Sequence, residues 1–228
     1  MPDLLLELFG EEIPASMQAR AAEDLKRLVC NGCRGANLPF ETAKAYVTPR
    51  RLILRITGLP KAQPDAREEI RGPKVDAPDK AIQGFLQGNG VSRDQCEERE
   101  LAKGVFLCAI IKHQGRPTME VLAEILPKVF ADLPWPKSMR WGSGSTRWIR
   151  PLHSILVLFD GTVVPLTFAG INSGIQTQGH RFHAPESFDV WEFADYRDKL
   201  VAAKVIIDPD ERCKIISKGA SRLAREAG

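Results

Sequence analysis

The amino-acid sequence predicts an α+β fold, with mixed or antiparallel sheets made of hairpins and with helices packed on them. Apolar runs of strand length come in pairs joined by short turns, whereas helical three-to-four-residue periodicity occurs in separate segments. Strand and helix patterns do not alternate regularly, which disfavours a doubly wound parallel sheet. With 228 residues, of which 43% are hydrophobic, the chain can bury a substantial core.

Residues 1–60 are expected to form an N-terminal strand, a helix and a hairpin. Leu4 to Phe9 is the strand, and Pro14 stands at the first position of the helix, where a missing N–H costs little. Apolar residues then recur at helical spacing until a stop near Gly32. The hairpin consists of two alternating runs and the turn between them: residues 43–47, residues 52–57 and Thr48-Pro49-Arg50-Arg51.

Residues 61–78 are expected to be a connecting loop, because Pro, Gly and charged residues dominate this stretch. Residues 79–133 then predict a helix, a hairpin and a second helix. The first helix is closed by Gly88 and Gly90, and the hairpin turns at Lys103-Gly104. The second helix is capped by Thr118 and runs to Leu133, with a break near Leu126-Pro127 because proline removes a backbone donor.

Residues 134–207 form a basic, tryptophan-rich segment with one hairpin, and residues 208–228 begin another helix. The hairpin signal is Asp160-Gly161, which lies between two apolar runs. Asp208-Pro209 opens the last helix, which has no stop signal before Gly228. We therefore expect this helix to be cut short.

Bulk composition excludes several classes of protein but names no partner. The formal net charge is only +3, so electrostatic arguments must be local. The longest apolar run is too short to span a membrane, and the N-terminus lacks a secretory signal, which predicts a cytoplasmic protein without a membrane partner. The five cysteines are an odd number at incomplete spacing, so we expect reduced thiols and no metal, although Cys30 and Cys33 form a C-x-x-C.

The segment from Pro134 to Phe182 concentrates positive charge and planar rings. It holds five basic side chains against one acid, Asp160, and it includes Trp135, Trp141 and Trp148. Arg grips phosphate with two parallel hydrogen bonds, and Trp can stack on bases, so a nucleic-acid surface is one reading. The other reading is a tryptophan core beneath a solvated basic face, and composition does not decide between them.

Two other places in the sequence present basic side chains at turns. Arg50 and Arg51 follow Thr48-Pro49 and could contact phosphate. At least as plausible is a hairpin whose arginines pair with Glu7, Glu11 or Glu12. Arg71 and Lys74 flank Gly72-Pro73 and could equally lie in a solvated loop. His180 and His183 lack a third metal ligand nearby, and we find no nucleophile elbow, no paired-carboxylate signature and no phosphate-binding P-loop, so no catalytic residue is assigned.

Six ordered phrases resemble the β subunit of the bacterial heterotetrameric glycyl-tRNA synthetase, in its N-terminal portion. They span residues 4 to 183 and are Leu6-Glu7 with Gly10-Glu11-Glu12-Ile13-Pro14, Thr48-Pro49-Arg50-Arg51-Leu52, Arg71-Gly72-Pro73, Met139-Arg140-Trp141-Gly142, Arg150-Pro151-Leu152-His153, and Thr177-x-Gly179-His180-Arg181-Phe182. Family members continue through a helical domain resembling metal-dependent phosphohydrolases and an anticodon-binding domain, and neither fits in 228 residues.

The resemblance implies a place in an α₂β₂ glycine–tRNA ligase. The α subunit would condense glycine with ATP, and the β subunit would present glycine tRNA. ATP and magnesium would belong to the whole enzyme, with no cofactor and no catalysis in this chain. The fold would be similar in kind to the α/β modules of the phenylalanyl-tRNA synthetase β chain.

Two roles for the chain remain open, a tRNA-binding region and an architectural region that docks the α subunit. A hydrolase acting on mischarged tRNA is disfavoured, because no activated nucleophile is evident. The candidate RNA-contacting residues are Arg50, Arg51, Arg71, Lys74, Arg140, Trp141, Arg147, Arg150, His180 and Arg181.

Overall fold

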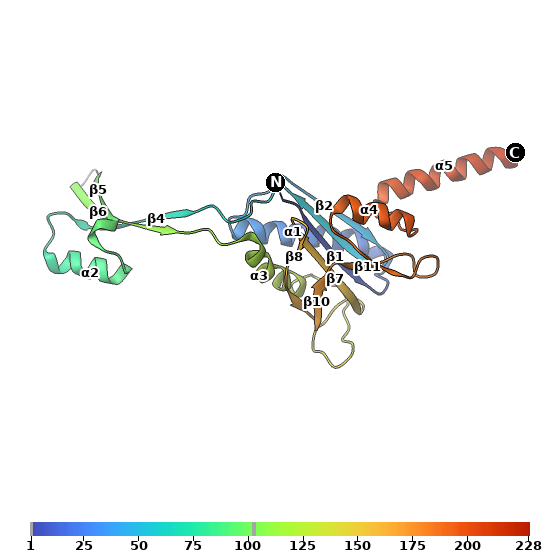
Figure 1. Ribbon diagram of the computed structural model, residues 1–228, viewed down its shortest axis with the longest axis horizontal. Coiled ribbons are helices and arrows are strands. Elements are labelled where there is room, and N and C mark those ends of the chain that lie inside the picture. Colours follow the sequence, from blue (N-terminus) through green and yellow to red (C-terminus); the bar gives the residue numbers. More distant parts are fainter. Residues whose placement is uncertain (1, 102–103) are drawn as a thin grey trace. The chain divides into compact units, whose positions relative to one another are not determined.

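The computed structural model describes residues 2–101 and 104–228, and the chain forms two compact units (Figure 1). The first unit comprises Met1–Ala62 and Pro117–Gly228, and the second comprises Gln63–Arg116. The fold is α+β, as the sequence predicts.

A seven-stranded sheet forms the centre of the first unit. Its strand order is β2-β3-β1-β7-β10-β9, and β8 pairs with β7 beside this path. All pairings are antiparallel except that of β7 with β10, so this is a mixed sheet. The strands are β1 (Leu4–Gly10), β2 (Thr42–Thr48), β3 (Arg51–Thr57), β7 (Leu152–Phe159), β8 (Thr162–Val163), β9 (Thr167–Phe168) and β10 (Ile171–Gly174).

Alternation along β1 distributes its side chains between two apolar cores. Leu4, Leu6 and Leu8 join the core that includes the helices α1 (Ala15–Gly35) and α3 (Thr118–Ala131). Leu5 joins the other core, which includes Tyr196 and Leu200 of α4 (Phe193–Ala202). The sheet is therefore covered on both faces, and each fully buried leucine contributes about 1.5–3 kcal/mol. Glu7 stands on the α4 side as the only charged residue of a wholly buried strand.

The predicted hairpins of the first unit are confirmed. β2 pairs with β3 through the turn at Pro49-Arg50. Asp160 and Gly161 turn between β7 and β8 with φ of 51° and 74°, the left-handed geometry that favours such residues in tight hairpins. The second arm is shorter than expected, because β8 ends at Val163 and the chain then enters β9 and β10.

The second unit contains a three-stranded antiparallel sheet in the order β4-β6-β5. Its elements are β4 (Ala66–Lys74), α2 (Asp79–Asn89), a 3-10 turn (Arg93–Gln95), β5 (Cys96–Leu101) and β6 (Gly104–His113). The predicted pairing of β5 with β6 is confirmed, whereas half of the predicted turn, Lys103, lies outside the described residues. Gly90 closes α2 in a left-handed conformation, as the sequence indicates.

The connecting loop expected over residues 61–78 is wrong for most of its length, because β4 occupies residues 66–74. Gly72 and Pro73 favoured the loop prediction, because both residues are typical of loops. In the structure they lie at an irregularity in the β4–β6 register between Arg71 and Lys74. A bulge tolerates a proline that cannot donate to the ladder. The pairing of β4 with β6 joins segments that are distant in the sequence, so no local pattern predicted it.

The expected unit over residues 79–133 is also wrong, because α3 belongs to the first unit and not to the β5–β6 hairpin. The helix continues through Pro127 without the predicted break. Leu126 precedes this proline, and Val129 and Phe130 follow it, and all three are buried in the same core, which holds both halves in place. Thr118 is the first helical residue and not the cap, since its hydroxyl donates to the carbonyl of Pro60 at 2.6 Å.

The remaining elements complete the first unit. α1 extends to Gly35, past the expected stop near Gly32, because its last turns bury Val29 and Cys33. β11 (Gln176–Gln178) pairs with β12 (Ser187–Asp189), and α5 spans Pro209–Ala227. Asp208 caps α5 by accepting from the backbone N–H groups of Asp210 and Glu211. None of the described helices is both long and apolar enough to cross a membrane.

Candidate functional site where the motif phrases converge

Four of the six sequence phrases meet at one end of the central sheet. Backbone hydrogen bonds join three of them: Gly10 N–H to Arg50 O at 2.9 Å, Ile13 N–H to Pro49 O at 2.6 Å, and Glu11 N–H to Pro151 O at 2.9 Å. The fourth phrase is joined through its Arg181 side chain, which donates to Glu11. Position 10 must be glycine, because a Cβ there would lie 2.6 Å from the Pro151 carbonyl oxygen. We call the side chains gathered here, from residues 10–14, 48–51, 150–153 and 179–182, the motif surface.

Glu11 organises the charges on this surface. Its carboxylate accepts from His153 Nε2 at 2.8 Å and from Arg181, and Arg50 Nη2 lies 4.0 Å away. The hydrogen bonds from His153 and Arg181 lower the pKa of the Glu11 carboxyl. The site therefore keeps an anionic centre that ties three phrases together near neutral pH.

An open cleft of about 740 Å³ lies beside this charge cluster. Its walls include Pro14 at the start of α1, Pro49, Met139, Arg150 and Arg181. Met139 brings a fifth phrase to the same place, since its backbone pairs with that of Trp148 in both directions. Arg150 and Arg181 remain exposed, so the cleft presents guanidinium groups to solvent.

Arg51 does not belong to the exposed surface, which contradicts its candidate role in RNA contact and confirms the alternative, pairing with a glutamate. Its side chain is 3% exposed, and Nε donates to the wholly buried Glu7 carboxylate at 3.0 Å. Glu7 also accepts from Thr177 Oγ1 at 2.6 Å and from the Tyr196 hydroxyl, and Arg51 donates to the Gln178 carbonyl. Burial, and then the charge of Glu7, raise the pKa of Tyr196. This network links β1, β3, β11 and α4 within the fold.

One of the three clustered tryptophans, Trp148, lies in the core. Trp148 is 3% exposed, its ring centroid is 5.1 Å from that of Trp135, and it also contacts Phe168. For Trp148 the reading as a base platform is therefore wrong, and the core reading is correct. Trp135 and Trp141 are half-buried against the same core, so each offers only part of its ring to a ligand.

The arginines of this segment are exposed, in contrast to its tryptophans. Arg147 donates to the Ser138 hydroxyl at 3.0 Å, and Arg150 approaches the Met139 sulfur at 3.9 Å. Arg140 has no hydrogen-bond or ion-pair partner among the residues that the structure describes. Arg71 and Lys74 are exposed too, but they belong to the second unit, where the Arg71 guanidinium lies 3.8 Å from the centre of the Phe106 ring.

Comparison with known proteins identifies the source of these phrases. The family described as glycyl-tRNA synthetase beta subunit matches residues 4–228. The chain belongs to the glycyl-tRNA synthetase β-subunit family. The resemblance seen in the six phrases is thereby confirmed.

Curated members of the glycyl-tRNA synthetase β-subunit family match over the whole of this chain. Identity is 52% with the glycine–tRNA ligase beta subunit of Cereibacter sphaeroides, covering 33% of that protein. It is 51% with that of Dinoroseobacter shibae, covering 32%, and 43% with that of Rhodospirillum centenum, covering 35%. The chain thus spans about a third of the length of the relatives it matches.

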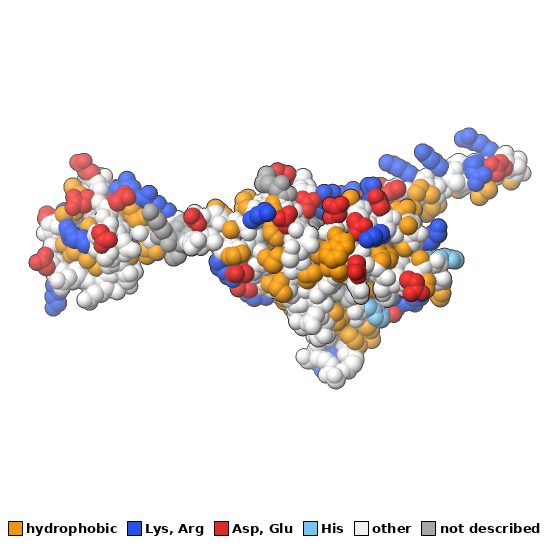
Figure 2. All heavy atoms as spheres, viewed as in Figure 1, with side chains coloured by type: hydrophobic (Ala, Val, Ile, Leu, Met, Phe, Trp, Pro, Cys, Tyr) orange, Lys and Arg blue, Asp and Glu red, His pale blue; other side chains and the backbone are white. Residues whose placement is uncertain are grey.

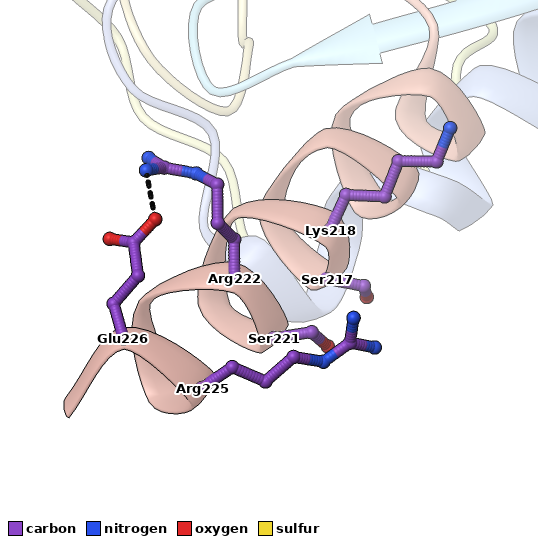
Figure 3. A pocket seen from close by; sticks show the side chains of 6 residues that line it. All are labelled: Ser217, Lys218, Ser221, Arg222, Arg225 and Glu226. Atoms are coloured by element: carbon purple, nitrogen blue, oxygen red, sulfur yellow. Dashed lines mark hydrogen bonds and ion pairs between the residues drawn. The ribbon is translucent and has the colours of Figure 1, made fainter. Parts of the chain in front are cut away.

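A separate depression lies on α5 alone. Figure 3 shows that all six of its lining side chains come from this one helix, with Arg222 and Glu226 paired at 2.9 Å. In the view of Figure 2, Lys and Arg side chains follow one side of α5 and hydrophobic side chains follow the other. The apolar side includes Ile215, Ile216 and Leu223, which are all exposed.

Metal-binding groups do not assemble in the described part of this β-subunit chain. No three His, Cys, Asp or Glu residues there are placed to hold an ion. Cys30 and Cys33 both lie buried on α1, and burial raises the pKa of the Cys33 thiol to about 12. A deprotonated thiolate ligand is therefore disfavoured at this position.

Sequence reasoning offered Glu7 and Glu11 as possible partners of the arginines at the β2–β3 turn, and the structure confirms this, but it missed Thr177 and Tyr196. Glu7, Thr177 and Tyr196 form the buried network, and Glu11 forms the surface one. A signal existed for Glu7, which is the only charged residue in an apolar strand and must find partners if buried. Tyr196 had none, because its partner lies far away in the sequence.

Proposed function

We propose that this chain supplies a tRNA-facing surface to a glycine–tRNA ligase, within the β subunit of an assembly that also contains an α subunit. The observation that supports this most strongly is the exposure of Arg150 and Arg181 on one cleft built from the motif phrases, with exposed Arg140 next to Met139 of its wall. Guanidinium groups at a concave surface suit the phosphate backbone of RNA.

The scaffold beneath these arginines also supports the proposal. Backbone hydrogen bonds fix the short turns of this surface, and the Glu11 cluster restrains Arg181, so less conformational entropy is lost on binding. Lysines on flexible loops would lose more conformational entropy. Glycine activation, with its ATP and magnesium, is assigned to the α subunit, as the family resemblance implies.

The experiment is a salt titration of glycine-tRNA binding. Replacing Arg140 and Arg150 with alanine should weaken affinity and reduce the slope of log K against log salt by about one per lost phosphate contact. A matched control is Arg20→Ala with Arg197→Ala, which removes the same charge from exposed positions on α1 and α4. An unchanged slope in the first variant, or an equal change in the control, would refute the RNA-facing role.

A second candidate function is docking of the α subunit without RNA contact. It is favoured by the exposed apolar side chains at the motif surface, since Met139 is 39% and Phe182 is 80% exposed. Under this function the Arg140 and Arg150 substitutions would leave the salt slope unchanged. Phe182→Ser would instead release the α subunit in sedimentation or size-exclusion measurements.

A cytoplasmic location and action as a glycine–tRNA ligase belong to the same proposal. The ligase activity rests on the names of longer relatives, of which this chain covers about a third, and the location rests on the sequence alone. We expect the chain alone not to charge tRNA with glycine. Its contribution would be to position tRNA for chemistry performed elsewhere.

A further inference from the structure

A second, smaller cleft adjoins the motif surface on the other side of Arg181. It lies between the β2–β3 turn, residues 179–182 and the segment that joins α4 to α5. Its volume is about 260 Å³, near the lower limit of small-ligand sites, which run from about 300 to 1,000 Å³. We call it the Thr48 cleft, and its walls include Thr48, Arg50, His180, Phe182, Lys204 and Arg212.

Positive charge dominates the walls of the Thr48 cleft. Arg51 is neutralised by Glu7, and Arg181 pairs with Glu11 and Glu12. Lys204 and Arg212 are different, because neither has a carboxylate partner in the described parts of the chain. Arg212 is held by three backbone carbonyls, those of Ile206, Ile207 and Val47, at 2.7 to 3.1 Å. Its guanidinium is therefore fixed in place while its charge remains uncompensated.

Lys204 occupies a backbone conformation that a lysine rarely adopts. Its φ is +64°, in the left-handed region, where a side chain costs about 1 kcal/mol or more. The following Val205 N–H bonds to the Leu200 carbonyl and so closes the end of α4. Glycine or asparagine would adopt this backbone conformation with less strain. A lysine at this position is explained if its ammonium group binds a ligand in the cleft.

Thr48 provides an independent sign of a missing ligand. The residue is 5% exposed, and its hydroxyl has no hydrogen-bond partner within residues 2–101 and 104–228. A buried hydroxyl without a partner is costly, and such groups are rare in folded proteins. Thr48 lines this cleft, so a polar ligand that reached the hydroxyl would satisfy it.

His180 and Phe182 complete the wall with a donor and a flat ring. The Nδ1 atom of His180 accepts from the backbone N–H groups of Phe182 and His183 at 3.2 and 3.3 Å. In the neutral ring the proton therefore lies on Nε2, which can donate to a ligand. Phe182 is 80% exposed, so one face of its ring is open to stacking.

We infer that the Thr48 cleft binds a single phosphate-bearing nucleotide unit. Lys204, Arg212 and the His180 Nε2–H would face the phosphate, the Thr48 hydroxyl would donate to it or to the ribose, and the base would stack on Phe182. Fixed cations, a buried donor and an aromatic face are the features that recognise nucleotides. The cleft holds one such unit, carried by a free nucleotide or by RNA.

Calorimetric titration with AMP and with inorganic phosphate tests this inference on the 228-residue chain. AMP should bind more tightly than phosphate, because only AMP can stack. Lys204→Gln should weaken AMP binding by about tenfold or more, since it removes a charged hydrogen bond. Thr48→Val should weaken it by about fivefold and yet raise the Tm of the free chain, because the unpaired hydroxyl is removed. This opposite effect on binding and stability is not expected of a purely structural threonine.

The controls separate this site from the proposed tRNA surface. Lys80→Ala, at an exposed lysine of α2, and the Arg140→Ala/Arg150→Ala variant should leave AMP affinity unchanged. Competition of AMP with glycine tRNA would identify the bound unit as part of the RNA, and AMP binding without competition would identify a free nucleotide. The inference is overturned if AMP does not bind, or if Lys204→Gln leaves its affinity unaltered.

Discussion

Arg51 and Glu7 form a buried ion pair at the centre of the first unit, and its removal should be severe. Arg51→Met would leave a wholly buried carboxylate with only the Thr177 and Tyr196 hydroxyls as donors. We expect the free energy of unfolding to fall by about 3–5 kcal/mol, because a buried charge loses its partner. Urea unfolding followed by circular dichroism measures this loss.

Arg55 offers a matched control on the same strand. It pairs with Asp3 at 2.7 Å, but both side chains are more than a third exposed. Arg55→Met should therefore cost about 1 kcal/mol or less. Similar losses in the two variants would mean that burial does not set the strength of the Arg51 pair.

Cys33 should react with alkylating reagents much more slowly than the exposed Cys213. Burial raises its pKa from 9.0 to about 12, and the neighbouring Cys30 adds to this. Only the thiolate attacks alkylating reagents, so Cys33 should stay unmodified at pH 8 while exposed Cys213 reacts first. Mass spectrometry after timed alkylation gives the order in which the thiols react. Early labelling of Cys33 would contradict its burial against the core.

The same pKa shift has a consequence for stability at high pH. The unfolded chain loses the Cys33 proton near pH 9, whereas the folded chain keeps it to about pH 12. The stabilisation is therefore complete below pH 9 and is lost as the pH rises toward 12. Cys33→Ala should remove this part of the alkaline decline.

At the scale of single elements, local chemistry predicted the hairpins well but failed for the Thr118 cap, the non-local pairing of β4 and the helix break at Pro127. Asp160-Gly161 and Asp208 act through their own backbone, and both behave as the sequence indicates. β4 escaped notice because its stability comes from β6, a distant strand. Tertiary burial around Pro127 likewise outweighed the local cost of a proline within α3.

Pro127 should therefore make α3 less stable than alanine would at the same position. Pro127→Ala would restore the N–H that can reach the Ala123 carbonyl, one turn earlier in the helix. We expect the free energy of unfolding to rise by about 1–3 kcal/mol. Lys128→Ala, at an exposed neighbour, should change it by only a few tenths of a kcal/mol. A fall in stability on replacing Pro127 would mean that its ring contacts matter more than the missing hydrogen bond.

For the whole molecule, the sequence predicted the family and the α+β class but not the site. Arg50, Arg150, His180 and Arg181 could be singled out one at a time, yet nothing local indicated that their segments meet at one end of a sheet. Arg51 and Trp148 show the converse, because side chains suited to RNA were placed inside the fold. Exposure depends on strand pairing, and pairing is a property of the whole chain.

The second unit should be removable without loss of the first. Ala62 and Pro117 form an antiparallel bridge, and Thr118 N–H bonds to the Lys61 carbonyl at 2.9 Å, so the two cut ends already lie together. The residues of both apolar cores in the first unit come from outside residues 63–116. Joining Ala62 to Pro117 through a short glycine linker closes only a small loop, which costs little entropy.

We expect the excised chain to keep a cooperative unfolding transition with a Tm close to that of the whole chain. An unfolded product would mean that the first unit depends on the second. The same variant tests the basic side chains of the second unit, because it lacks Arg71 and Lys74 while it retains the motif surface. If both contact phosphate, the salt slope of glycine-tRNA binding should fall by about two, one for each lost contact. An unchanged slope would confine RNA contact to the first unit and remove Arg71 and Lys74 from the candidates.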